Sequence, residues 1–353
     1  MQRTMKKERF SMKGIFYTVI FSFLLMSCSE RQDVDLERKG DGLVYGVNEE
    51  QPYTGEYISY YDSGQKESKG DYTNGKQEGP WEWFHENGQL SKKGSYKNGI
   101  EEGFWELFYD KGQLSVKGNY KDGKENGLST SWYENGQKTE EVNNKNGKRD
   151  GVYTRWYENG QKRVETNYRE GTLIGFDRSW YENGQKEKEG NYKDQKRDGL
   201  WTKWYSNGKK KEEEKYKEGI LIGPVIDWTE KGEKSEGTYK DGKQDGLWVF
   251  WDENGKKKLD QNFQDGWENG LRTSWYANGQ KEQEIEYKEG QQDGMFVWWH
   301  ENGQKAQEGT YKNGQQDGPY TYSNEKGIIY RSEIWSDGGL KETRFYEDGK
   351  LVE

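Results

Sequence analysis

Aromatic and polar residues alternate along the chain in a pattern that returns at a fixed interval. The recurring unit reads roughly G-x-W-x-x-W-Y-E-N-G-Q-K-x-x-x-G-x-Y-K-x-G-K-x-D. Asn-Gly between two apolar-containing runs is the strongest short signal for a β-hairpin, because both residues tolerate a positive φ. Each unit therefore predicts a first strand such as residues 81–85, a tight turn at residues 87–88, a second strand ending near Tyr96, and a looser link over residues 97–103.

The spacing of the units predicts a repeat architecture. Successive turn glycines are 24 residues apart, with one step of 23 between Gly232 and Gly255. The turn glycines are Gly64, Gly88, Gly112, Gly136, Gly160, Gly184, Gly208, Gly232, Gly255, Gly279, Gly303 and Gly327. Such self-similarity is typical of proteins in which each unit buries its apolar face only against its neighbours. We therefore predict an all-β fold, a repetitive antiparallel β-hairpin meander that forms an elongated, twisted open sheet.

Regularly spaced rings should form ladders along this sheet. Side chains alternate between the two faces of a strand, so the Trp-Tyr pair of each unit should send one ring to each face. One candidate ladder consists of Trp132, Trp156, Trp180, Trp204, Trp228, Trp251, Trp275 and Trp299. Core packing explains this ladder without a ligand, and we expect Trp204 in mid-array to belong to the core. Binding of a sugar polymer or a peptide along an exposed ladder is the alternative.

Three segments depart from the repeat pattern. Residues 172–177 (TLIGFD) and 220–226 (ILIGPVI) are aliphatic where other copies carry polar residues. A bend, a wider core or a contact surface would each account for them, and the sequence leaves these alternatives open. Residues 43–54 precede the first full unit and predict a leading cap strand.

The N-terminal region carries the marks of export. An uncharged apolar run, residues 15–26, follows a basic region. This arrangement is typical of a secretory signal peptide, and the run is too short for a membrane-spanning helix. The sequence Leu-Met-Ser-Cys that ends at Cys28 resembles the bacterial lipobox, which implies that Cys28 becomes the lipidated first residue of the mature protein.

We therefore divide the chain into a signal peptide (residues 1–27), a polar tether (residues 28–42) and the repeat array (residues 43–353). Hydrophobic residues make up only 29% of the chain and aromatic residues 15%, which suits a thin β-structure of stacked rings. Residues 1–27 hold five basic residues and one acidic residue, so their removal changes the net charge from −9 to −13. Nucleic acids and anionic lipids attract clustered Lys and Arg. We expect no nucleic-acid partner, and membrane contact through the lipid anchor only.

The sequence offers little catalytic chemistry. His85 and His300 each stand before Glu-Asn-Gly-Gln, where other units have Tyr, and we interpret them as replacements of one flat side chain by another. No phosphate-binding loop, nucleophile motif or His-based metal spacing occurs. Acidic residues recur with the unit, which indicates turn chemistry rather than a paired-carboxylate site. Residues 241–246 (DGKQDG) resemble a calcium loop only faintly. We therefore predict no catalytic residue, cofactor or metal, and no enzyme activity.

The full unit resembles the bacterial MORN repeat variant, as in the YwqK-type antitoxin family. The resemblance rests on G-x-W-x-x-W-Y-E-N-G-Q-K followed by G-x-Y-K-x-G-K-x-D-G, and it extends over about residues 43 to 350. It implies a MORN-like hairpin array and an antitoxin-like or interaction role. The alternation of Gly with Trp-Tyr pairs is also similar, more faintly, to choline- and glucan-binding repeats of cell-wall proteins.

These observations favour a non-enzymatic, lipid-anchored scaffold of the cell envelope that binds a protein partner. Two alternatives remain: a module that binds carbohydrate or peptidoglycan, and an antitoxin or immunity protein paired with a toxin. Ser29, directly after the lipidated cysteine, favours the outer membrane by resemblance to other lipoproteins.

Overall fold

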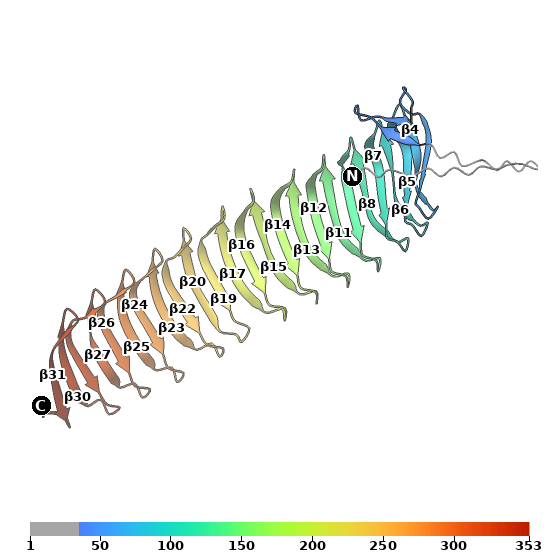
Figure 1. The fold of residues 1–353 in the computed structure, drawn as a ribbon. Coiled ribbons are helices and arrows are strands. Elements are labelled where there is room, and N and C mark those ends of the chain that lie inside the picture. The colour runs from blue at the N-terminus through green and yellow to red at the C-terminus, as the bar shows by residue number, and fades with distance from the viewer. Residues whose placement is uncertain (1–34, 353) are drawn as a thin grey trace, which may run out of the picture.

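The fold is a single elongated sheet of consecutive hairpins (Figure 1). A computed structural model describes residues 35–352; the predicted signal peptide and Cys28 lie outside the described residues. Each strand of the 30-stranded sheet pairs antiparallel with strands next to it in sequence, or with the one beyond an intervening two-residue strand, so the predicted open hairpin meander is confirmed. The described residues form strands, turns and bends but no helix.

The strands are β1 (Leu36–Arg38), β2 (Val44–Gly46), β3 (Gly55–Tyr60), β4 (Lys66–Thr73), β5 (Lys76–Phe84), β6 (Leu90–Lys97), β7 (Ile100–Phe108), β8 (Leu114–Lys121), β9 (Lys124–Glu125), β10 (Gly127–Trp132), β11 (Lys138–Lys145), β12 (Lys148–Trp156), β13 (Lys162–Arg169), β14 (Thr172–Trp180), β15 (Lys186–Lys193), β16 (Lys196–Trp204), β17 (Lys210–Lys217), β18 (Ile220–Leu221), β19 (Gly223–Trp228), β20 (Lys234–Lys240), β21 (Lys243–Gln244), β22 (Gly246–Trp251), β23 (Lys257–Gln264), β24 (Trp267–Trp275), β25 (Lys281–Lys288), β26 (Gln291–Trp299), β27 (Lys305–Lys312), β28 (Gln315–Gln316), β29 (Gly318–Ser323), β30 (Ile329–Ser336), β31 (Gly339–Glu347) and β32 (Lys350–Leu351).

The two turns of the unit exchange the roles that the sequence predicted for them. In the Glu-Asn-Gly-Gln turn only the glycine has a positive φ, 84° at Gly160, and the loop closes with Tyr157 N–H donating to the carbonyl of Gln161 at 2.8 Å. The two-residue turn lies at the other end, where Glu170 and Gly171 have φ of 51° and 84°. The expected tight turn and loose link are therefore reversed. The cause is the loop type: Gly160 N–H donates to the carbonyl of Tyr157 at 2.9 Å, which closes a turn whose last residue is the glycine in the left-handed region, so the asparagine before it needs no positive φ.

Each Glu-Asn-Gly-Gln hairpin carries a β-bulge, and the 23-residue step removes it. In β16–β17, Trp204 pairs with Lys210 and Lys203 with Glu212, so Lys211 is left without an opposite residue. In β19–β20, Trp228 pairs with Lys234 and Asp227 with Ser235, with no shift of register. The residue missing from the short repeat is therefore the bulge residue, and the pairing on either side is preserved.

The most buried rings form a row that the sequence analysis did not single out. They are Trp81, Trp105, Tyr153, Trp201, Trp248, Phe296 and Tyr320, all at most 8% exposed. They stand three residues before the predicted ladder, and therefore on the opposite face of the strand. We call the face of Trp201 the ring face and the face of Trp204 the tryptophan–lysine face. Trp204 is only half-buried, so the expectation that it belongs to the core is not met.

A glycine in the preceding strand makes room for each buried indole. A Cβ at Gly190 would lie 2.2 Å from the ring of Trp201, a distance that no real contact allows. Gly70, Gly94 and Gly237 stand in the same relation to Trp81, Trp105 and Trp248. Where that position is Thr166, Glu214 or Gln261, the following repeat carries Asp177, Val225 or Arg272 in place of an indole. The second glycine of the unit is thus a packing requirement of the next repeat.

The N-terminal end of the array is covered by a small hairpin. Strands β1 and β2 pair with each other, and Val44 N–H donates to the carbonyl of Gly75 at 3.0 Å. Val44 and Tyr45 are 5% and 7% exposed. β2 lies within the predicted cap segment, and β1 lies within the second half of the predicted tether.

Candidate interaction surface

The predicted tryptophan ladder lies in one row on the tryptophan–lysine face, and all eight rings are half-buried. A lysine of the preceding hairpin stands over most of them: Lys186 Nζ is 5.5 Å from the ring centroid of Trp204, and Lys234 Nζ is 4.5 Å from that of Trp251. The same contact joins Lys138, Lys162, Lys257 and Lys281 to Trp156, Trp180, Trp275 and Trp299. Six of the eight rings therefore have a cation over one face, an arrangement that contributes about 0.5–1 kcal/mol at exposed sites.

The same lysines pair with carboxylates three residues further along. Lys186 Nζ lies 2.7 Å from Glu189, and Lys257 Nζ lies 2.7 Å from Asp260. Equivalent pairs involve Lys138–Glu141, Lys162–Glu165, Lys210–Glu213, Lys281–Glu284 and Lys305–Glu308. The acidic residues form a charged row along the middle of this face. Sequence analysis did not predict this arrangement of charges.

This charged row changes sign towards the N-terminus. The second-strand position holds Lys69, Lys93 and Lys117 in the first three repeats, and an acid from Glu141 onward. Glu106 lies between two of these lysines, 2.8 Å from Lys93 and 2.9 Å from Lys117, and their hydrogen bonds lower its pKa. The tryptophan–lysine face therefore has two electrostatically distinct parts.

A second row on this face is apolar and exposed, and sequence analysis missed it. Each member stands one residue before the position of the buried ring, directly after a glycine. Leu200, for example, stands between Gly199 and Trp201. Phe104, Leu128, Val152, Leu200, Leu247, Leu271 and Met295 belong to it, with exposed fractions from 42% to 66%. The signal was present as the first x of G-x-W, which is apolar in most units. Polar residues of the intervening strands lie between its members, as Lys215 does beside Leu200 and Asn262 beside Leu247.

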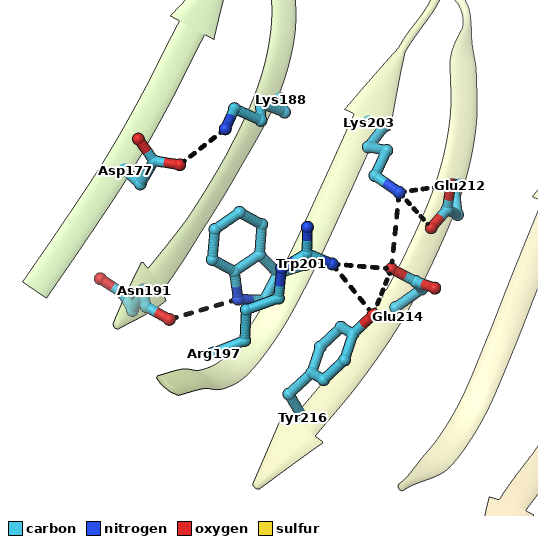
Figure 2. Close-up of polar contacts among 9 residues, drawn as sticks. All are labelled: Asp177, Lys188, Asn191, Arg197, Trp201, Lys203, Glu212, Glu214 and Tyr216. Carbon is cyan, nitrogen blue, oxygen red and sulfur yellow. Dashed lines mark hydrogen bonds and ion pairs between the residues drawn. The ribbon is translucent and has the colours of Figure 1, made fainter. Parts of the chain in front are cut away.

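The ring face has a charged cluster in mid-array, next to Trp201 (Figure 2). Lys203 Nζ lies 2.7 Å from Glu212 and 3.7 Å from Glu214, and Arg197 lies 3.7 Å from Glu214. Burial, together with the hydrogen-bonded Glu212 carboxyl, raises the pKa of Glu214 to about 6. Glu214 pairs with Trp201 across β16 and β17. It occupies the second-strand position that is a glycine wherever the next repeat carries a buried indole. The cluster thus replaces a Gly-Trp pair with compensated charges.

The two histidines occupy equivalent positions in distant repeats and do not come together. His85 Nε2 is 3.1 Å from the carbonyl oxygen of Phe108, and His300 Nε2 is 2.9 Å from that of Ser323. Turn tyrosines make the same contact, as Tyr181 does by donating to the carbonyl of Trp204 at 2.8 Å. The interpretation of His as a replacement for Tyr is confirmed.

Within residues 35–352, no group of three or more His, Cys, Asp and Glu side chains is placed to hold a metal ion. In the faint calcium-like segment, Asp241 and Gly242 form a two-residue turn with φ of 51° and 80°. The described part of the chain contains no helix long and apolar enough to cross a membrane.

An array of stacked hairpins in which each unit packs only on its neighbours defines a β-hairpin repeat protein. The chain belongs to the MORN repeat variant family, whose profile matches more than half of it. The matched segments are residues 53–74, 77–98, 101–122, 125–146, 149–170, 178–194, 197–218, 244–265, 268–289 and 292–313. The match passes over residues 219–243, which include the short repeat step.

Among curated proteins, no sequence matches this chain. The solved structures that resemble it include crystal structures of TcdB2-TccC3-Cdc42, TcdB2-TccC3-TEV and TcdB2-TccC3. Their identities are 12%, 10% and 9%, over 83%, 80% and 83% of this chain. This chain spans only 18%, 18% and 19% of theirs, with TM-scores of 0.16, 0.15 and 0.13. At such scores the likeness carries no functional argument.

Proposed function

We propose that this protein is a non-enzymatic, repeat-based scaffold of the cell envelope that binds another protein along its tryptophan–lysine face. The observation that carries the proposal is the exposed apolar row, which follows the array from Phe104 to Met295. Successive members are one repeat apart, about 10 Å, except at the steps from Val152 to Leu200 and from Leu200 to Leu247, which are two repeats and about 20 Å. An elongated partner could bury several members at once, each contributing roughly 25 cal/mol per Å² of apolar area removed from water.

The charged row beside it would orient the partner. Lysines in the first repeats give way to acids from Glu141 onward, and complementary charges on a partner would favour one direction of docking over the other. Charge matching of this kind contributes more to specificity and association rate than to affinity. We therefore propose an envelope protein with an elongated, partly apolar surface as the partner.

The place of the scaffold in the cell is proposed from its N-terminal sequence. A lipid on Cys28 would anchor it, and Ser29 favours the outer membrane. Cys28→Ser should abolish lipid labelling and move the protein from the membrane to a soluble exported fraction. Unchanged membrane attachment of this variant would contradict the lipoprotein assignment.

A second candidate function is binding of a cell-wall glycan. Half-exposed rings at regular intervals favour it, because sugar rings stack on aromatic side chains. However, a lysine stands over most of these rings, 4.5–5.9 Å from their centroids. A sugar would first have to displace that lysine from both the ring and its carboxylate. We therefore rank the glycan second.

The proposal is tested by capturing the partner and then removing the apolar row. The partner is identified by crosslinking in intact envelopes, purified, and measured against the wild type and the triple variant Leu200→Ser, Leu247→Ser, Met295→Ser. We expect the triple variant to lose binding and Arg155→Ser, on the ring face, to retain it. Equal binding by both would contradict the assigned surface. If the wild type is retained on purified cell-wall glycan and the double variant Trp180→Ala, Trp204→Ala is not, glycan binding becomes the first candidate function.

A further inference from the structure

The repeat around the 23-residue step departs from the regular repeats at three positions. Thr229 and Asp252 stand where the other repeats have a turn Tyr or His, apart from the last repeat, which has Asn324. The bulge residue between Lys234 and Ser235 is missing. All three changes remove side-chain volume from the ring face at the Glu-Asn-Gly-Gln end of the sheet.

The missing tyrosines also leave a hydrogen-bonding position without its usual donor. The phenol of Tyr205 donates to the carbonyl of Trp228 at 2.8 Å, and that of Tyr276 to the carbonyl of Trp299 at 2.7 Å. Among the described residues, no side chain donates to the carbonyl of Trp251, the equivalent acceptor for position 229, although Trp251 itself pairs with Lys234 in the strand ladder. Thr229 instead accepts a hydrogen bond from Glu233 N–H at 3.2 Å, within its own turn.

A hollow of about 350 Å³ lies at this place. Phe250 and Leu259, which pair across β22 and β23, form its apolar floor. Asp227 lines one side, and burial raises the pKa of its carboxyl. The ion pair between Lys258 and Glu233, at 3.1 Å, stands at the turn end. The hollow is therefore an apolar pocket with a polar rim, a combination typical of binding sites.

We infer that this hollow binds the phenol ring of a tyrosine side chain carried by a partner protein. The array itself supplies the argument: in neighbouring repeats a tyrosine fills this position and donates its hydroxyl to the next strand. A ring entering from outside would pack on Phe250 and Leu259 and donate to the carbonyl of Trp251. The inference rests on the proposed function only in that the partner is a protein. The hollow lies on the ring face, opposite the face that carries the apolar row.

The test measures binding of small probes to the full chain by NMR, using the indole N–H signals of Trp228 and Trp251. The probes are N-acetyl-tyrosinamide, N-acetyl-phenylalaninamide and p-cresol. We expect saturable shifts with both phenols and about fivefold weaker binding of the phenylalanine compound, which lacks the donated hydrogen bond. Thr229→Tyr fills the hollow from within and should abolish binding. Ala277→Tyr, at an exposed turn position of another repeat, is the matched control and should bind normally.

Three results would overturn the inference: no shift with either phenol, equal affinity for the phenylalanine compound, or undiminished binding by Thr229→Tyr. If p-cresol binds and N-acetyl-tyrosinamide does not, the ligand of the hollow is a free small phenol, and the inference of a tyrosine side chain is wrong. Thr229→Tyr leaves the apolar row intact, so its capture of the envelope partner tests the scaffold function separately. If the phenols do not bind but this variant still captures the partner, the inference about the hollow fails and the proposed scaffold function stands.

Discussion

The regular repeats around residues 134–209 and the divergent repeat around residues 220–256 share their strands but differ in how neighbouring hairpins are joined. In the regular part, Tyr157 donates to the carbonyl of Trp180 at 2.8 Å. The amide of Asn159 donates to the carbonyl of Glu182 at 2.9 Å. Both contacts reach the next repeat, so the turns are held together in a row along one end of the sheet.

In the divergent repeat the corresponding side chains bond within their own turns. Asp252 accepts hydrogen bonds from Asn254 N–H and Lys256 N–H, both at 2.9 Å. The backbone pairing of β19, β20 and β22 nevertheless continues. Backbone hydrogen bonds therefore keep the sheet continuous, whereas the side chains of the turns can be exchanged. One repeat can therefore lose its turn contacts and acquire a hollow without interrupting the array.

The largest effect should come from the Gly-Trp packing, which occurs in both regions, at Gly190 and Trp201 in the regular part and at Gly237 and Trp248 in the divergent repeat. Trp201 is 1% exposed and packs on Gly190, so Trp201→Ala should lower the free energy of unfolding by about 3–5 kcal/mol. Trp204→Ala, three residues along and half-buried, should cost about half as much or less. Denaturant unfolding of both variants measures the difference, and equal losses would show that the two rows contribute alike to the core.

A smaller effect should follow from moving turn tyrosines between the two regions. Tyr181→Phe deletes the hydrogen bond to the carbonyl of Trp204 and should cost about 0.5–1.5 kcal/mol. Thr229→Tyr adds the same contact to the divergent repeat and should stabilise it by a similar amount. Thermal unfolding of the two variants beside the wild type checks both signs. A destabilising Thr229→Tyr would mean that the hollow cannot accommodate a ring.

The sequence predicted the fold because its strongest signals are local. Asn-Gly turns at a fixed period specify consecutive hairpins, and such hairpins can only pair with their neighbours in an open meander. The exchange of turn roles was missed because Asn-Gly fits two kinds of hairpin loop, a two-residue turn with both residues at positive φ and a longer loop with only the glycine there. The turn with Lys111 before Gly112 has the same single positive φ, so the loop length rather than the asparagine sets the pattern.

The surface was harder to predict than the fold because it depends on which row each ring joins. Trp201 and Trp204 look alike in the sequence, and only the glycine eleven residues before Trp201 distinguishes the buried ring. The hollow depends on two separate changes that the fold brings together, at Thr229 and at a missing bulge residue. The 23-residue step was visible in the sequence, but which residue was absent follows only from the strand register.

A pH-dependent effect should distinguish the charged cluster beside Trp201 from a Gly-Trp pair. The pKa of Glu214 is raised to about 6 in the folded protein, above its ordinary value of 4.5. Its contribution to stability is therefore full below about pH 4.5 and is lost as the pH rises through about 6. Glu214→Gln should become more stable relative to the wild type over this interval, by less than about 1 kcal/mol after solvent screening. A difference that is constant between pH 4 and pH 7.5 would contradict the raised pKa.

The smallest effect separates the ring contact of the lysines from their ion pair. Lys186 contacts both Glu189 and the ring of Trp204, whereas Lys210, at the edge of the divergent repeat, pairs with Glu213 but has no ring contact in the described part of the chain. Lys186→Met should therefore cost about 0.5 kcal/mol more than Lys210→Met in denaturant unfolding. High salt should reduce the loss common to both variants, because exposed ion pairs are screened, and should leave the difference between them largely unchanged. Equal losses at low salt would show that the lysines serve the carboxylates alone, and the tryptophan faces would then be free for a ligand to stack on.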